Sequence, residues 1–553
     1  MKIKIIEFFD REYNGPKGRI ILTSCLGSLC FPALLAIANR GAEITGYIST
    51  WTEAAILLIY LLISAVAVTC KISTLNQATI IAEEAVRSVR VRLADKLRRT
   101  ELRFLETEKK GEIYARIVED TEIISQTSAN ITNTLEAFLT SIVVFLYMMT
   151  ISVSGFVVAL LCIVCIYGVF FSNYFKVKEK IKKARLEEAD FFDLLNDTLS
   201  GFKEIKINSR KNSALFADIE DLSHEIEANT LEPELEFDKG IIVLGSMLLN
   251  ISLGVLIFIV PLFSHSHGKV VIKLVTSMLF VIGLMGMVLR GTSVNVMANV
   301  GVENLERLED AIDEFGVHEE TEDLKDSYSD FREIVLDSVV FQYMDKEEVL
   351  FKAGPIDLKI RQGEILFIVG GNGSGKSTLL KLLTGLYYPM AGGRIITDDR
   401  TVTRDNYQSY RELFSIIFTD FHLFRKLYGL ESVDGQKVKS LLKKLDIHTK
   451  TDYSEGRFIN TNLSTGQRKR LAYIAALLEN KPVYVFDEWA ADQDPVFRKH
   501  FYENFLEDLR TMNKTVIAVT HDDRYFDSAD RVIKLEEGKI AEYRVTDGQI
   551  KNT

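Results

Sequence analysis

A glycine-rich turn between a strand-forming run and a helix-forming run is the feature that most constrains this chain. The apolar, β-branched residues 365–369 predict a buried strand, and the leucine-rich residues 379–383 predict a helix. The turn between them, residues 370–378, reads GGNGSGKST and contains the pattern GxxxxGKS. In such a turn the backbone N–H groups point at a phosphate, and the helix N-terminus adds about half a positive charge. The sequence therefore predicts a P-loop within an α/β domain.

Each position of this loop has an expected task. We expect Lys376 to reach the β- and γ-phosphates of a nucleotide and the hydroxyl of Ser377 to bind Mg²⁺. A chance glycine loop is the alternative interpretation, and the flanking strand and helix argue against it. The residues expected to contact the nucleotide here are Gly370, Asn372, Gly373, Ser374, Gly375, Lys376, Ser377 and Thr378.

A second buried strand ends in two carboxylates. Residues 483–486 are apolar, and Asp487 and Glu488 follow them directly. We expect Asp487 to hold Mg²⁺ and Glu488 to orient or deprotonate an attacking water. A strand that ends in a solvated acidic pair is the alternative, and the P-loop upstream makes it the weaker interpretation.

Two further segments belong to the same predicted site. Ser464 suits the N-cap of a helix over residues 469–478, and Gly466 permits a close backbone approach at this second anion-binding helix start. His521 comes soon after the apolar strand 516–519, where it is placed to sense a γ-phosphate. A lone histidine is usually structural, but its position behind the other motifs favours the functional interpretation.

Long apolar runs fill the first 300 residues. Residues 137–175 contain no Asp, Glu, Lys or Arg, and this length is nearly twice the about 20 residues that cross a bilayer. The run therefore predicts two helices with a turn at the small residues 152–155. Six spans are predicted, at about 20–39, 54–70, 134–153, 155–174, 241–263 and 274–298.

The basic residues predict the orientation of these spans. Segments 71–130 and 175–239 carry about ten Lys and Arg each, whereas loop 40–53 has only Arg40. We therefore expect a multi-pass membrane protein with both termini in the cytoplasm. Apolar residues at helical spacing in the two basic segments predict that the spans continue into the cytoplasm as helices.

An acidic stretch separates the two halves of the chain. Residues 303–330 carry a net charge of −10, against −11 for the whole chain, so the acidity is local. No basic stripe indicates a nucleic-acid partner. The predicted organisation is a transmembrane domain at 1–302, an acidic linker at 303–330 and a nucleotide-binding domain at 331–553.

The order of the motifs carries a family resemblance. A P-loop, the segment LSTGQ at 463–467, a strand ending in Asp-Glu and a strand-end histidine together resemble the ATP-binding-cassette (ABC) nucleotide-binding domain over residues 331–553. The resemblance implies ATP and Mg²⁺ as ligands and Tyr343 as the aromatic that stacks on adenine. It also implies that the residues Ser464, Gly466 and Gln467 complete the ATP site of a second copy, so the chain would act as a homodimer.

The membrane half is similar to that of six-span ABC exporters. Phe104, residues 111–116 and Asp120 resemble their first intracellular loop. The expected fold is therefore a membrane α-helical six-span bundle of the ABC exporter type, followed by an α/β P-loop ATPase domain. Glu488, His521 and Lys376 would be its catalytic residues.

Three segments narrow the resemblance. Residues 201–206, 418–424 and 487–495 are similar to the bacterial cyclic-peptide and siderophore exporters, such as those of pyoverdine, syringomycin and microcin J25. This resemblance implies an ATP-driven exporter of a cyclic peptide or peptide siderophore in the bacterial inner membrane. The alternatives are an exporter-shaped importer of a metal–siderophore, an exporter of lipid or drug and, more remotely, an ATP-gated channel or sensor.

One position departs from the wider family. Most ABC domains have a glutamine that contacts Mg²⁺ where this chain has Thr419, whose side chain offers a shorter oxygen. The expected Mg²⁺ ligands are Ser377, Asp487 and Thr419, with Asp420 as the alternative to Thr419.

Overall fold

The computed structural model describes residues 4–44, 49–259, 268–316, 331–345, 348–390, 392–430, 433–545 and 549–552. The chain divides into two compact units, and each is described by itself. The helical unit comprises residues 1–98 and 108–314, and the sheet unit comprises residues 99–107 and 315–553.

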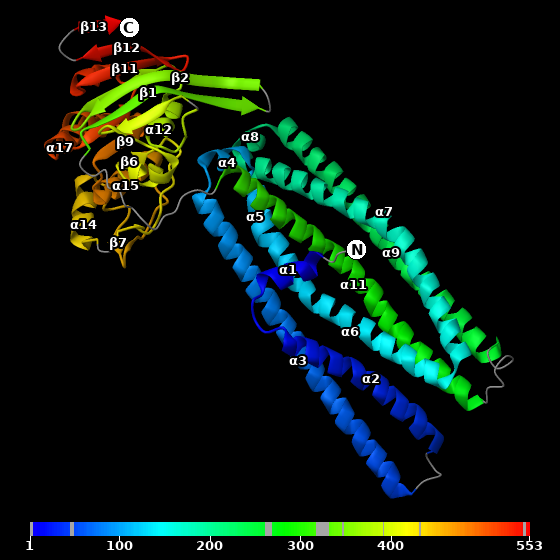
Figure 1. The fold of residues 1–553 in the computed structure, drawn as a ribbon. Coiled ribbons are helices and arrows are strands. Elements are labelled where there is room, and N and C mark those ends of the chain that lie inside the picture. The colour runs from blue at the N-terminus through cyan, green and yellow to red at the C-terminus, as the bar shows by residue number, and fades with distance from the viewer. Residues whose placement is uncertain are drawn as a thin grey trace. The chain divides into compact units, whose positions relative to one another are not determined.

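Long helices make up the helical unit (Figure 1). Its helical elements are α1 (Lys4–Glu12), α2 (Gly18–Ile44), α3 (Thr50–Arg99), α5 (Lys110–Ala115), η1 (Arg116–Asp120), α6 (Thr121–Ile151), α7 (Val153–Ser200), α8 (Phe202–Ile207), α9 (Ser209–Gly254), η2 (Val255–Ile259) and α11 (Gly268–Phe315). Helix α6 ends where Ser152 becomes extended, and the Ser152 hydroxyl caps α7 by accepting a hydrogen bond from the Gly155 N–H. Helices α7 and α9 run side by side.

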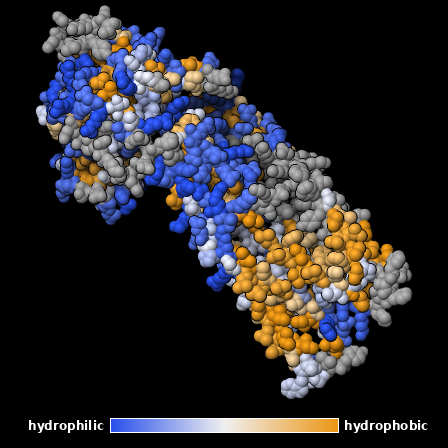
Figure 2. Space-filling model, viewed as in Figure 1, coloured by the Kyte–Doolittle hydropathy of each residue, from blue (hydrophilic) through white to orange (hydrophobic). Residues whose placement is uncertain are grey.

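Four helices in the described residues are long and apolar enough to cross a membrane. They are α2, α3, the helical stretch from Lys110 to Ile151, and residues Gly268–Val288 of α11. Their apolar side chains face outward, as at Leu57, Leu58 and Leu61 of α3, and Figure 2 shows apolar side chains gathered over one end of the helical unit. Such a surface suits contact with lipid rather than water.

The count of six spans stays a prediction. The fourth predicted span lies within α7, and the fifth runs from α9 and η2 to residue 263, past the last described residue of that segment, Ile259. In the described part of the chain only the four helices above meet the criteria of length and hydropathy.

The predicted acidic linker at 303–330 begins inside a helix. Helix α11 continues to Phe315, and residues 317–330 lie outside the described part. The acidic residues fold into α11 because basic side chains of other helices face them: Glu306 pairs with Arg11 of α1, and Glu309 pairs with Arg92 of α3. Local composition indicated a linker, whereas these distant partners neutralise the charge and allow a helix.

The sheet unit has an α/β architecture. Its strands are β1 (Glu333–Asp345), β2 (Glu348–Arg361), β3 (Ile365–Gly370), β4 (Arg394–Thr397), β5 (Arg400–Thr401), β6 (Phe414–Ile417), β7 (Tyr453–Ser454), β8 (Arg457–Phe458), β9 (Val483–Asp487), β10 (Thr515–Val519), β11 (Arg531–Glu536), β12 (Lys539–Val545) and β13 (Gln549–Asn552). Its helices and helical turns are α4 (Leu102–Thr107), α12 (Lys376–Leu383), η3 (Arg404–Asn406), α13 (Tyr407–Arg411), α14 (Gly435–Lys444), α15 (Thr465–Glu479), η4 (Trp489–Asp492), α16 (Pro495–His500), η5 (Phe501–Phe505), α17 (Leu506–Thr511) and η6 (Asp523–Ser528).

The central sheet has the strand order β13-β12-β11-β3-β10-β9-β6. Strands β11, β3, β10, β9 and β6 run parallel, and alternate residues enter two separate cores. On β3, Leu366 and Ile368 pack in the core that includes α12, whereas Ile365 and Phe367 pack in the core that includes α15. A strand buried on both faces explains the uninterrupted apolar runs that precede each motif.

Candidate functional site

The P-loop connects β3 to α12. Strand β3 ends at Gly370, and Lys376 is the first residue of α12. Gly375 has φ +98°, which side chains other than glycine rarely adopt. At Gly370 a Cβ atom would lie 2.5 Å from the carbonyl oxygen of Leu535, so close backbone packing requires glycine there.

This loop fits a polyphosphate. The Lys376 ammonium is buried and donates to the carbonyl oxygens of Gly370 and Gly371 at 3.0 and 2.9 Å, so it lies folded back over the loop. The hydroxyl of Ser374 is buried without a hydrogen-bond partner, which a phosphate oxygen would provide. Ser377 is exposed beside them, so its hydroxyl is accessible to a cation.

The acidic pair lies at the same edge of the sheet. Parallel pairing sets Val519 of β10 opposite both Ile368 of β3 and Asp487 of β9, so the ends of the three strands are adjacent. Burial raises the pKa of the Asp487 carboxyl group, and a hydrogen bond from Thr419 opposes that rise. Thr419 Oγ1 also lies 3.4 Å from the backbone oxygen of Asp487.

The oxygen atoms of Asp487, Ser377 and Thr419 would suit Mg²⁺. A carboxylate from Asp487 with hydroxyls from Ser377 and Thr419 is a hard, sparse donor set, and Mg²⁺ in such sites keeps waters and substrate phosphates as its other ligands. The described residues contain no cluster of three or more His, Cys, Asp or Glu side chains that could hold a metal alone.

Glu488 and His521 are in polar contact with each other. Glu488 Oε1 lies 3.2 Å from His521 Nε2, and both side chains are partly exposed. Glu488 has left-handed backbone angles (φ +51°), and its N–H donates to Val519 at 3.2 Å. The carboxylate is therefore held beside the P-loop edge, where it could accept a proton from water.

The LSTGQ segment opens α15. Ser464 and Gln467 form a capping box, in which each side chain accepts a hydrogen bond from the backbone of the other. Ser464 is exposed, and a Cβ atom at Gly466 would lie 2.7 Å from the carbonyl oxygen of Asp492. Among the described residues, no hydrogen bond or ion pair joins these three residues to the P-loop of the same chain.

Tyr343 is connected to the helix that follows the P-loop. Its hydroxyl lies 3.4 Å from Thr378 Oγ1 and 3.0 Å from the hydroxyl of Tyr387. Its ring packs edge-on to Phe341 and Tyr387. The ring is only half-buried, which leaves part of it free to contact a base.

Helix α4 packs within the sheet unit. Phe104 is fully buried, with its ring 5.7 Å from that of Phe315, and Glu106 pairs with Lys381 of α12 at 2.7 Å. Glu106 also accepts a hydrogen bond from Tyr387. The resemblance of this segment to an intracellular loop was the only available signal, because these contacts join residues far apart in sequence.

A buried lysine was also missed. Lys469 follows Arg468 in a basic run that is typical of a solvated helix face, yet its side chain lies inside the sheet unit. Its ammonium group contacts the acidic turn after β9.

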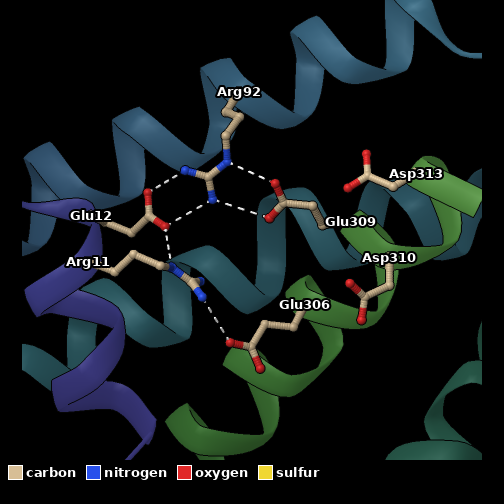
Figure 3. A pocket seen from close by; sticks show the side chains of 7 residues that line it. All are labelled: Arg11, Glu12, Arg92, Glu306, Glu309, Asp310 and Asp313. Atoms are coloured by element: carbon tan, nitrogen blue, oxygen red, sulfur yellow. Dashed lines mark hydrogen bonds and ion pairs between the residues drawn. The ribbon is translucent and has the colours of Figure 1, made fainter. Parts of the chain in front are cut away.

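A charged pocket lies in the helical unit (Figure 3). It has a volume of about 430 Å³, and Arg92 at its wall binds Glu12 of α1 and Glu309 of α11. Its lining residues are Arg11, Glu12, Arg92, Glu306, Glu309, Asp310 and Asp313. Since carboxylates outnumber guanidinium groups, the pocket does not suit a nucleotide phosphate.

Comparison with known proteins agrees with the geometry. Residues 353–491 match the family described as "ABC transporter", and residues 20–213 match "ABC transporter transmembrane region". The chain is 36% identical to "ATP-binding protein SyrD" of Pseudomonas syringae pv. syringae over 388 residues, which cover 68% of each protein.

Two further similarities extend this result. The "probable syringafactin export ATP-binding/permease protein SyfD" of the same pathovar is 31% identical over 231 residues, 39% of this chain and 35% of that protein. The solved structure of a bacterial Atm1-family ABC exporter with ATP bound aligns with a TM-score of 0.74 at 20% identity, covering 95% of this chain and 94% of that one. The chain therefore has the fold of that exporter.

Proposed function

Because the chain belongs to the ABC transporter family, we propose that it exports a cyclic peptide or a peptide siderophore and works as a homodimer. It is an ABC exporter, in which a transmembrane region precedes an ATPase domain that couples ATP hydrolysis to transport. One observation carries the proposal: a P-loop, an Asp-Glu pair and a histidine meet at one sheet edge in a chain that also carries apolar spans.

Two observations support the cargo class. Segments 201–206, 418–424 and 487–495 resemble those of cyclic-peptide and siderophore exporters. Independently, one relative in P. syringae is named for syringafactin export. The similarity to SyrD covers 388 residues and therefore extends beyond the ATPase motifs. The preference for a peptide over a lipid or drug rests on the three segments and on the name of SyfD.

The homodimer follows from how the binding elements are distributed. The chain has one P-loop and one LSTGQ segment, and within the described residues no hydrogen bond or ion pair joins them. The start of α15 is exposed at Ser464 and presents its N-terminus as an anion site. In a pair of chains, each P-loop would face the partner's LSTGQ segment, which gives two equivalent ATP sites.

Each residue of the site has a role in this proposal. Ser374, Lys376 and the P-loop amides would bind the phosphates, while Ser377, Asp487 and Thr419 would hold Mg²⁺. When bound, Mg²⁺ neutralises charge that develops on the phosphates. Glu488 would accept the proton of the attacking water, and His521 would hold the Glu488 carboxylate in place.

The differential binding free energy that ATP must supply to close the pair of chains is moderate. Shifting a two-state equilibrium from 1:99 to 99:1 requires about 5.5 kcal/mol of differential affinity. Two ATP molecules, each contacted by both chains only in the closed pair, would supply that difference.

The basic residues of segments 71–130 and 175–239 favour both termini in the cytoplasm of a bacterial inner membrane.

Transport into inverted inner-membrane vesicles tests the proposal. Vesicles would be incubated with a labelled cyclic lipopeptide, a peptide siderophore or a short-chain fluorescent phospholipid. We expect ATP-dependent accumulation of one of the two peptide probes, and none with the Lys376→Ala variant. ATP-driven loss of preloaded metal–siderophore would show an importer, accumulation of the phospholipid alone a lipid exporter, and ohmic current without accumulation a channel.

A further inference from the structure

Lys469 of α15 is buried in a way that is rare for lysine. Its side chain is 1% exposed, although its neighbour Arg468 is only partly buried. Removing an ammonium group from water is costly unless hydrogen bonds and a counter-charge compensate. The partners of Lys469 therefore indicate which part of the structure the buried ammonium group holds in place.

The ammonium group has two partners, one at each end of a short turn. Lys469 Nζ donates to the backbone oxygen of Glu488 at 2.7 Å and pairs with the carboxylate of Asp492 at 2.6 Å. In return, the indole N–H of Trp489 donates to the backbone oxygen of Lys469 at 2.9 Å. Helix α15 and the turn η4 are thus joined by reciprocal bonds directly beside the acidic pair.

Glu488 is the residue of that turn that most needs support. It has φ +51° and ψ +37°, a left-handed conformation that is unfavourable for a residue other than glycine. Rotation out of this conformation would redirect both its carbonyl group and its side chain. The Glu488 carboxylate lies 3.2 Å from His521 Nε2. A donor that holds the Glu488 carbonyl group holds the backbone conformation and therefore the direction in which the side chain leaves it.

We infer that Lys469 is a positioning residue for Glu488: its ammonium group holds the Glu488 carbonyl and thereby aims the carboxylate, while Asp492 serves as the counter-charge. The inference rests on the proposed role of Glu488 as the base in ATP hydrolysis. A purely structural lysine would need the same counter-charge, so the two roles must be separated by substituting Lys469 and Asp492 singly and together.

Three variants of the full-length protein in nanodiscs separate these roles. Lys469→Met removes the donor and keeps an unbranched side chain of similar size. Asp492→Ala leaves the ammonium group without its counter-charge. The double variant removes both charges, so no ammonium group stays buried without its counter-charge; only Lys469 is buried, whereas the Asp492 side chain is 45% exposed.

ATPase rate and thermal midpoint are measured for each variant. We expect Lys469→Met and the double variant to lower kcat by about 10- to 100-fold. The KM for ATP should stay within about twofold, because only the alignment of the carboxylate changes. Asp492→Ala should lower the midpoint and leave kcat within about threefold. Lys499→Met, at an exposed lysine with a surface partner, is the matched control and should change neither quantity.

Two results would overturn the inference. One is a double variant that folds and hydrolyses ATP at the wild-type rate. The other is an equal loss of kcat in Lys469→Met and Asp492→Ala, which would assign the effect to the turn as a whole. The Glu488→Gln variant in the same assay tests the premise that Glu488 is the base. Wild-type turnover in this variant would reject that role independently of the results for Lys469.

Discussion

At the scale of single residues, the contact between Glu488 and His521 defines the expected chemistry. The two side chains are 3.2 Å apart and only partly buried, so water can reach the carboxylate. Replacing Glu488 by Gln keeps the shape and removes the proton acceptor. We expect ATP hydrolysis to fall by about 10²–10⁴-fold, while binding of a fluorescent ATP analogue persists.

A matched substitution controls for loss of negative charge. Glu503→Gln changes an exposed glutamate that only pairs with Lys499 on the surface, and its turnover should equal that of the wild type. If Glu488→Gln hydrolysed ATP at near-normal rate, another group would have to accept the proton.

At the scale of elements, local pattern predicted the strands and loops but not their distant partners. The strand before the P-loop and the helix after it are visible in sequence because apolar runs and glycines act locally. The burial of Lys469 could not be seen in the sequence, because a run of three basic residues is normally solvated. Its partners lie at 488 and 492, and only the fold brings them to α15.

The same limit applies to the acidic stretch and to α4. The carboxylates from 303 onward have the composition of a linker, but their basic partners belong to α1 and α3. The contact of Glu106 in α4 with Lys381 in α12 joins residues 275 positions apart. Motif order could indicate the site, whereas these long-range ion pairs had to be found in three dimensions.

Helix α4 gives a prediction about coupling. It follows α3 directly in the chain, yet Phe104 is 0% exposed within the sheet unit. Removing a fully buried Phe ring costs about 3–5 kcal/mol, enough to release the helix. We expect Phe104→Ala to reduce cargo transported per ATP hydrolysed several-fold, because ATPase movements would no longer reach α3.

A neighbour in the same helix is the control for this effect. Leu105 is 36% exposed, so Leu105→Ala should leave the ratio of transport to hydrolysis nearly unchanged. Equal ratios for Phe104→Ala and the wild type would show that the buried ring does not carry the coupling.

The charged pocket of Figure 3 gives a prediction about pH. Burial raises the pKa of Glu12, but hydrogen bonds from Arg92 and Arg11 outweigh it, so the pKa lies below its usual value. The pKa of Glu309 is likewise raised by burial and lowered further by hydrogen bonds from Lys96 and Arg92, so it also lies below its usual value. A lowered carboxyl pKa stabilises the fold fully above the unfolded value of about 4.3, and this contribution is lost as the pH falls through the folded value.

Substitution of Arg92 tests this prediction. At pH 7 Arg92→Met should destabilise the helical unit by about 1–3 kcal/mol, because Glu12, whose side chain is 3% exposed, keeps only Arg11 as a partner. The difference in thermal midpoint from the wild type should persist down to about pH 4.3 and shrink as the pH falls below this value, through the lowered pKa of the folded state. A difference that does not depend on pH would mean that lost packing, rather than ion pairing, destabilises the variant.

At the scale of the whole molecule, the proposed homodimer predicts that the exposed start of α15 faces the P-loop of a second chain. Two defective chains can test this directly: Lys376→Ala disables the P-loop, and Ser464→Arg places a bulky cation at the exposed LSTGQ segment. If ATP sites form between copies, a mixed dimer has one site with both defects and one intact site. If sites form within one chain, the mixed dimer has none.

Co-expression with two affinity tags isolates the mixed dimer. We expect each variant alone to be inactive and the purified mixed dimer to recover up to about half of wild-type ATPase activity, since one of two equivalent sites is intact. Tagged wild-type pairs set the reference rate. An inactive mixed dimer of correct mass would place the complete site within a single chain and remove the reason for a homodimer, because nothing in the site would then depend on the second copy.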